Sequence, residues 1–125
     1  MKKGREKMRA IRGAITVCGN TEEEILSASK ELLREILKRN EEACRDMVSM
    51  IFTLTPDLDA VFPAKAARLM GITDVPLMCM SEIPVKGALE MCIRALVYVN
   101  TDLGRDEINH VYLRDAVKLR PDLAK

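Results

Sequence analysis

The segment from Thr21 to Leu37 has the pattern of a long amphipathic helix, and this pattern limits what the rest of the chain can form. Thr21 and Glu24 make the T-x-x-E capping box that begins many helices. Apolar residues then follow at helical spacing, with charged residues between them. The apolar residues are Ile25, Ala28, Leu32, Leu33, Ile36 and Leu37. A helix of this kind has one apolar face to bury. We expect that face to cover one side of a β-sheet.

Five segments rich in β-branched and other apolar residues supply the strands of that sheet. They are residues 9–17, 47–54, 75–80, 91–100 and 110–113. Gly13 is expected to interrupt the first strand, and the nearly continuous apolar run of the second predicts a buried strand. Pro63 favours the start of a short helix over 64–70, which Gly71 ends. The order of elements predicts a single-domain α/β (α+β) fold, with one mixed sheet and helices on one face.

The length and composition fit one globular domain without a membrane span. The 125 residues are 48% hydrophobic and 31% charged, close to the average for globular proteins. The longest run without a charged residue, 47–56, falls far short of the ~20 residues that a bilayer span needs. A sheet covered on one side leaves its other side bare, and a chain this short has no second layer to cover it. We therefore expect a homo-oligomer in which sheets pack on one another.

Positive charge is concentrated at the amino terminus. Residues 1–12 contain six basic residues and one acidic residue, although the whole chain carries a net charge of only +1. We interpret residues 1–8 as a basic N-terminal extension and residues 9–125 as the folded domain. The alternative, an arm that binds nucleic acid, predicts an affinity that falls steeply with salt. A solvated tail is the more ordinary interpretation, and no nucleic-acid partner is expected.

The cysteines and the single histidine do not form a metal-binding pattern. Cys18, Cys44, Cys79 and Cys92 include no C-x-x-C pair, and His110 is the only histidine, so a structural zinc site is not expected. No apolar h-region follows the basic residues, which argues against a secretory signal. Reduced thiols without such a signal favour a cytoplasmic protein.

Two arginines lie inside apolar strands, and they are the main indication of function in this sequence. Strand alternation places Arg94 on the same face as Leu96 and Tyr98, and Arg12 lies within the first strand. A guanidinium removed from water needs an anion, and its planar set of N–H donors suits a carboxylate or phosphate. Each arginine pairs with a buried carboxylate of the chain, for which Glu82 is a candidate, or lies on an edge of the sheet, or binds a small anionic ligand. The chain has no Gly-rich phosphate loop and no nucleophile elbow.

Five motifs in a fixed order carry a resemblance to a known family. They are IRGAITV (11–17), TPDLDAVFPAKAAR (55–68), VPLMCMSE (75–82), CIR (92–94) and HVYLRDAVKLRPDL (110–123). Through them the chain resembles the monofunctional bacterial chorismate mutases of the trimeric α/β class. The resemblance implies a five-stranded mixed sheet with helices on one face. It also implies a homotrimer whose sheets pack into a pseudo-β-barrel, with active sites at the subunit interfaces.

The resemblance further implies an enzyme that needs no cofactor. Chorismate mutases are isomerases that rearrange chorismate to prephenate in the shikimate pathway, at the branch toward phenylalanine and tyrosine. One C–O bond breaks and one C–C bond forms in a single cyclic step without proton transfer, which agrees with the absence of acid–base motifs. The alternative is a trimeric module of similar fold that binds or senses a small carboxylate. Such a module would bind chorismate without converting it.

The motifs assign residues to this site, as the resemblance implies. Arg94, Glu82 and Arg12 are the expected catalytic residues, with Arg94 facing the ether oxygen and Arg12 a substrate carboxylate. Met78 stands where a relative can carry a small polar residue. The expected substrate-binding residues are Arg12, Phe62, Ala64, Lys65, Arg68, Leu77, Met78, Cys79, Glu82, Arg94, Tyr112, Leu119 and Arg120.

Overall fold

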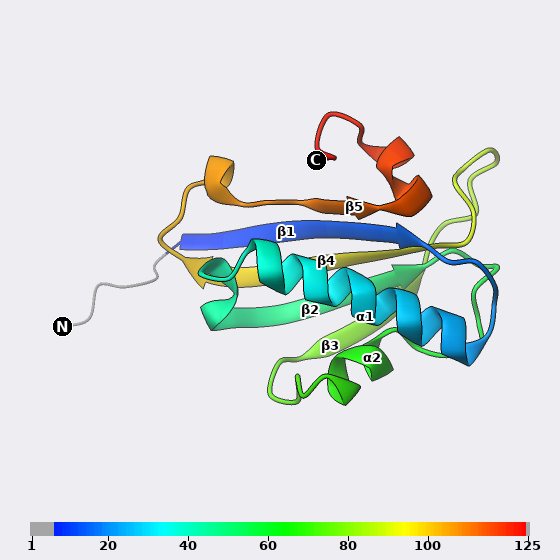
Figure 1. Cartoon of the computed structure of the whole chain (residues 1–125), viewed down its shortest axis with the longest axis horizontal. Helices are drawn as coiled ribbons and strands as arrows, with labels where there is room; N and C mark the ends of the chain where they lie inside the picture. The colour runs from blue at the N-terminus through cyan, green and yellow to red at the C-terminus, as the bar shows by residue number, and fades with distance from the viewer. Residues whose placement is uncertain (1–6, 125) are drawn as a thin grey trace.

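Five strands form one mixed sheet, and helix α1 lies across one of its faces in the computed structural model (Figure 1). The structure describes residues 7–124. The strands are β1 (Lys7–Thr16), β2 (Met47–Leu54), β3 (Leu77–Ser81), β4 (Cys92–Thr101) and β5 (Val111–Leu113). The helices are α1 (Glu22–Arg39) and α2 (Ala64–Leu69), with short 3₁₀ helices η1 (Ala43–Asp46), η2 (Arg105–Glu107) and η3 (Arg114–Leu119).

The order of strands across the sheet is β3-β2-β4-β1-β5. The central strand β4 is antiparallel to both of its neighbours, β2 and β1, whereas each edge strand is parallel to its neighbour, β3 to β2 and β5 to β1. β2 and β3 follow each other in the chain, so their connection, which contains α2, crosses back along the sheet. The predicted fold class, a single domain with a five-stranded mixed sheet, is confirmed.

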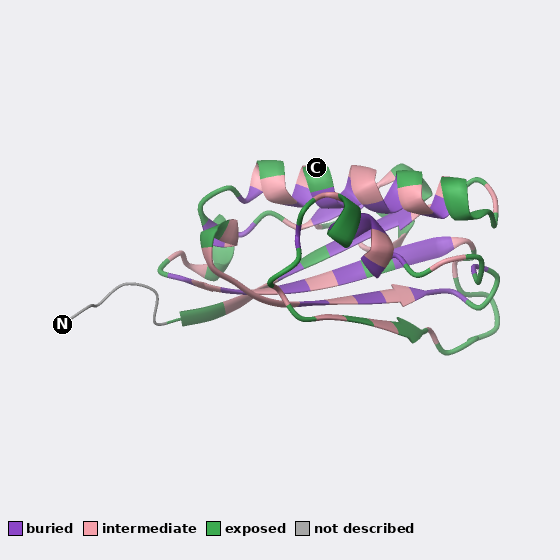
Figure 2. Ribbon diagram, turned by 90° about the horizontal axis from the view of Figure 1, so that it is seen from below, coloured by how far each residue is buried: buried purple, intermediate pink, exposed green. Residues whose placement is uncertain are grey.

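Helix α1 begins and packs as the sequence pattern predicts. The Thr21 hydroxyl oxygen accepts a hydrogen bond from the backbone N–H of Glu24 at 3.1 Å. Figure 2 shows α1 along one side of the sheet, with its buried residues turned toward the strands. Gly13 lies under this helix, because a Cβ atom there would stand 2.6 Å from Cδ1 of Ile36. The glycine therefore lets helix and sheet approach, and the predicted interruption at Gly13 is wrong, since β1 is continuous through it.

Strand β2 is buried on one face only, which corrects the prediction of a wholly buried strand. Met50, Phe52 and Leu54 are buried beneath the helices, whereas Ile51 and Thr53 between them are half-buried. The apolar run hides this alternation, since Ile51 lies on the second face of the sheet. Burial on both faces would require a second covering layer.

The second face is covered at one end only. Ala14, Cys92 and Tyr112 form a small apolar cluster there with Ala116 of η3, and Leu119 packs against its margin. In residues 7–124, no helix is long and apolar enough to cross a membrane. Of the predicted extension, residues 1–6 lie outside the described part, and the last two residues, 7 and 8, already pair with β4.

Candidate active site

The side chains of strand β4 alternate between the core and the second face of the sheet, and Arg94 points to the second face. Ile93, Ala95 and Val97 are buried under α1, while the Arg94 side chain is 50% exposed on the opposite face. Arg12 is exposed as well. In the single subunit neither guanidinium group is removed from water. The physical reason is that the second face has no full covering layer, so strand alternation carries these side chains to the surface.

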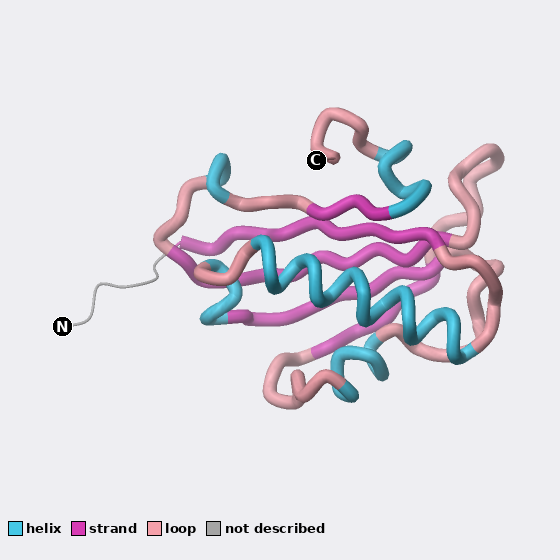
Figure 3. The backbone as a smooth tube through the Cα atoms, in the orientation of Figure 1, coloured by secondary structure: helices cyan, strands magenta, loops and turns pink. Residues whose placement is uncertain are grey.

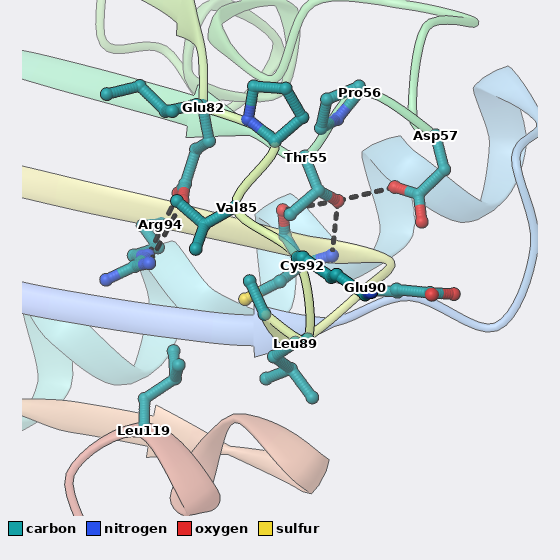
Figure 4. A pocket seen from close by; sticks show the side chains of 15 residues that line it. Thr55, Pro56, Asp57, Glu82, Val85, Leu89, Glu90, Cys92, Arg94 and Leu119 are labelled. Atoms are coloured by element: carbon teal, nitrogen blue, oxygen red, sulfur yellow. Dashed lines mark hydrogen bonds and ion pairs between the residues drawn. The ribbon is translucent and has the colours of Figure 1, made fainter.

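Arg94 is held by a two-point contact with Glu82. Its Nε lies 2.9 Å from Oε2 of Glu82, and its Nη2 donates to Oε1 at 2.9 Å (Figure 4). The pairing of Arg94 with Glu82, one of the alternatives left open by the sequence, is thus present. Two N–H bonds are used in this fork, and a guanidinium has five. The remaining donors leave room for a ligand.

Glu82 is itself fixed from two directions. Its side chain is only 15% exposed, and its backbone N–H donates to the carbonyl oxygen of Leu54 at 2.8 Å. The Thr53 hydroxyl donates to Oε2 of the same carboxylate. Because Thr53 is also the cross-strand partner of Arg94, acid, hydroxyl and guanidinium form one connected group on the second face.

The residues opposite one another across the sheet form a row on this face. Met80, Thr53, Arg94, Ala14 and Tyr112 are successive cross-strand partners from β3 to β5, and directly opposite residues share a face. A cavity of about 500 Å³ lies over this row, lined by these residues except Ala14 and also by Arg12 and Glu82. This is large enough for a small carboxylate ligand. We call it the Arg94 cavity.

A second cavity, of about 410 Å³, lies on the other side of the Arg94–Glu82 pair. Figure 4 shows Leu119 of η3 lining it together with this pair. The loop 83–90 forms much of its wall, with Ile83 and Val85 strongly exposed, and residues 55–57 and Cys92 also line it. Arg120 follows Leu119 and donates through Nε and Nη2 to the two oxygens of Asp122, at 3.0 and 2.8 Å.

The predicted residues of the second motif lie elsewhere, at the β3 edge of the sheet. Helix α2 stands beside β3 (Figure 3), and Phe62, which precedes it, is 67% exposed. Lys65 forms an ion pair with Glu22 at 2.6 Å, and Arg68 is exposed. Ala64 is buried. The single subunit therefore does not bring this group to the Arg94 cavity.

The predicted residues of β3 divide between its two sides. Leu77 and Cys79 pack against the main core, whereas Met78 between them is 58% exposed on the second face. Burial raises the pKa of the Cys79 thiol, although the Ala64 backbone N–H and the Arg68 charge act in the opposite direction. Cys79 thus lies next to the start of α2 and does not face Arg94.

Sequence reasoning missed Thr53 and the bracing of β4 by Thr55 and Asp57. The Thr55 hydroxyl donates to Asp57 at 2.5 Å and accepts from the backbone N–H of Cys92 at 2.9 Å. Asp57 also accepts from the backbone N–H of Met91 at 3.0 Å. Both residues belong to the TPDLDAVFPAKAAR motif (55–68), which was the available signal. For Thr53 the signal was the alternation with Ile51 on the second face.

A family model described as chorismate mutase type I matches residues 8–123. The chain belongs to this family. It is 52% identical over 118 residues to the chorismate mutase AroH of Bacillus subtilis (strain 168), covering 94% of this chain and 93% of that protein. It is 49% identical over 117 residues to the AroH enzyme of Thermus thermophilus, covering 93% and 96%.

A solved structure agrees with these relatives. The chorismate mutase from Clostridium thermocellum has 53% sequence identity and a TM-score of 0.83, with 86% of this chain and 96% of that chain covered. Type I chorismate mutases are isomerases that convert chorismate to prephenate. The predicted family, enzyme class and chorismate mutase function are therefore confirmed.

Proposed function

We propose that the chain converts chorismate to prephenate in the Arg94 cavity, with Arg94 beside the ether oxygen of the substrate. The observation that carries this placement is the fork between Arg94 and Glu82. The fork holds the guanidinium in one plane, exposes its remaining donors, and lies on a face where Arg12 supplies a second positive charge. Two positive charges on one face suit a substrate that carries two carboxylates.

The rearrangement requires no general acid or base from the protein. The C–O bond breaks while the C–C bond forms, so no proton has to be moved. The protein has two tasks, to select the folded conformer of chorismate and to stabilise the negative charge that builds on the ether oxygen. The N–H donors of Arg94 that Glu82 does not use serve the second task. Glu82 and Thr53 keep those donors aimed and avoid reorganisation during the reaction.

The remaining predicted residues take binding roles in this proposal. Arg12 binds one carboxylate of chorismate, and Tyr112 at the end of the cross-strand row helps to hold it. Leu119 and Arg120 close the site from the carboxyl-terminal side. This is supported by the position of Leu119 in the second cavity, which shares Glu82 and Arg94 with the Arg94 cavity.

We further propose a homotrimer in which each site is completed by a second subunit. The second face carries exposed Met78 and Met80 and half-buried Leu96 and Tyr98, and apolar side chains of this kind favour contact with another sheet. The segment 62–68 lies at the β3 edge, away from Arg94 in its own subunit. In a closed ring of sheets, this segment faces the Arg94 cavity of a neighbour and adds Lys65 and Arg68 to it.

Two smaller assignments complete the proposal. The catalytic domain comprises residues 9–125 together with Lys7 and Met8, which pair with β4, and the basic residues before them have no role in turnover. The protein works in the cytoplasm, which suits its four free cysteines.

Subunit mixing tests where the site lies. One variant carries Lys65→Ala and Arg68→Ala, the other carries Arg94→Ala, and each alone is expected to consume chorismate very slowly. Mixed trimers should regain activity, because some interfaces then combine an intact segment 62–68 with an intact Arg94. The assay is the loss of chorismate absorbance without added cofactor, and each variant exchanged with itself is the control. Proven mixed trimers without recovery would place the sites within single chains.

A further inference from the structure

His110 makes a contact with Arg12 that the proposed mechanism does not use. It lies directly before β5, and its Nδ1 accepts a hydrogen bond from the backbone N–H of Arg12 at 3.0 Å. The parallel pairing of β1 with β5 begins one residue later, at Gly13 and Val111. The imidazole therefore takes the place of a backbone acceptor at the end of this ladder. It joins two positions that are 98 residues apart in the chain.

This hydrogen bond requires a neutral imidazole. A ring nitrogen accepts only when it carries no hydrogen, so Nδ1 must be bare and the proton must be on Nε2. In the charged ring both nitrogens are donors. Protonation of His110 then places an N–H against the N–H of Arg12, and the contact is lost.

The surroundings of His110 favour the neutral ring. Burial lowers the pKa of His110 below its ordinary value of 6.5, and the nearby charges of Arg12 and Arg120 lower it further. The bond is therefore intact at neutral pH and is lost as the pH falls through this lowered pKa. The other ionisable residues that line the two cavities beside His110 are Arg9, Tyr98, Arg105 and Arg39. Asp122 is near Arg12 but is engaged by Arg120.

We propose that His110 is a positioning residue, whose neutral ring fixes the Arg12 backbone for substrate binding and releases it on protonation. This inference rests on the proposed function, in which Arg12 binds a carboxylate of chorismate. An arginine side chain reaches a defined point only if its Cα is held, and Arg12 lies next to the end of the β1–β5 ladder. The role of His110 is thus indirect, since it acts through Arg12.

Two substitutions separate the acceptor from the charge. His110→Asn keeps a side-chain oxygen near the position of Nδ1 and cannot titrate, whereas His110→Leu removes the acceptor at similar size. We expect His110→Asn to retain kcat/KM within about twofold at pH 7.5. We expect His110→Leu to lower kcat/KM about tenfold, mainly through a higher KM.

The pH profile supplies a readout that a merely structural role would not move. The parent enzyme should lose kcat/KM on the acid side of pH 6.5, with a midpoint equal to the His110 pKa. His110 is the only histidine, so the NMR signal of its ring gives that pKa directly in the trimer. His110→Asn should lack this acid limb. The inference is overturned if the limb persists in His110→Asn, or if a folded His110→Leu trimer keeps the parent kcat/KM.

Failure of the proposed function has a different signature. A parent protein that consumes no chorismate at any pH would refute the proposed activity itself, whatever the NMR titration shows. Should His110→Leu fail to fold, the comparison of parent and His110→Asn profiles still decides the matter, because both keep the acceptor and only one can be protonated.

Discussion

The two faces of the sheet differ in burial and in charge, and strand β4 shows this difference at two neighbouring residues. Ile93 is fully buried beneath α1, while the next side chain, Arg94, is half exposed and paired with Glu82. The covered face is completed by the chain itself. The second face, apart from the end under η3, is left with a charged pair, a cavity and exposed methionines.

This contrast shows that one face of the sheet stabilises the fold, while the other carries the residues proposed for catalysis. An apolar face packed under a helix gains free energy from burial and needs no polar partner. A face that carries Arg12, Glu82 and Arg94 gains little from burial, because charged groups are costly to desolvate. The residue spacing of one strand therefore separates the two tasks, and substitutions at adjacent positions should have effects of different kinds.

The largest expected effect is on the rate, at Arg94. Removing one preorganised donor from such a site costs a hundred- to a thousandfold in kcat, or about 3–4 kcal/mol of transition-state stabilisation, and Arg94→Ala should lose at least this. Arg94→Lys keeps the charge but not the planar fork, so it should also be strongly impaired, mainly in kcat. Chorismate absorbance measures the rates, and thermal unfolding checks that both variants fold. A stable Arg94→Ala trimer within threefold of the parent rate would refute the assignment.

The matched effect on the covered face is on stability, at Ile93. Ile93→Ala leaves a cavity under α1 and should lower the free energy of unfolding by about 2–5 kcal/mol. Its kcat per folded molecule should stay within about threefold of the parent, because Ile93 points away from the Arg94 cavity. Chemical denaturation measures the first quantity, and the assay at 20 °C with the folded fraction known measures the second. An Ile93→Ala enzyme that is stable but slow would show that the two faces are not separate.

The covered face is the part that the sequence predicts well, because its signals are local. The capping of α1 by Thr21 and the helical spacing after it are readable within a few residues. The alternation of β4 likewise placed Arg94 on one face. Its exposure was not readable, since that depends on which elements cover the second face. The wholly buried strand predicted for β2 failed for the same reason.

The arrangement of residues on the second face depends on contacts between segments that are distant in the chain. Such contacts leave weaker signals in the sequence. Residues of five motifs were assigned to one site at a subunit interface. The single subunit brings together Arg12, Glu82, Arg94 and Tyr112 and leaves segment 62–68 at another edge, so the assignment of that segment stays a prediction. The contact of His110 with Arg12 follows from the register of β1 and β5, which no local pattern encodes. Thr53 was hidden in an apolar run, because Ile51 on its face is apolar too.

The smallest expected effect is at Thr53, which acts on Arg94 through Glu82. Thr53→Val keeps the size and strand preference of the side chain but removes the hydroxyl that donates to the Glu82 carboxylate. The loss of one hydrogen bond of this kind is worth about 1 kcal/mol, so kcat should fall about three- to tenfold with little change in KM. Ser49→Ala removes a hydroxyl from the same face of β2, opposite Tyr98, and should leave kcat unchanged. The decisive measurement repeats Thr53→Val in an Arg94→Ala background, where it should have almost no further effect because the group it orients is gone. If Thr53→Val slows both enzymes equally, its hydroxyl does not work through the Arg94–Glu82 fork.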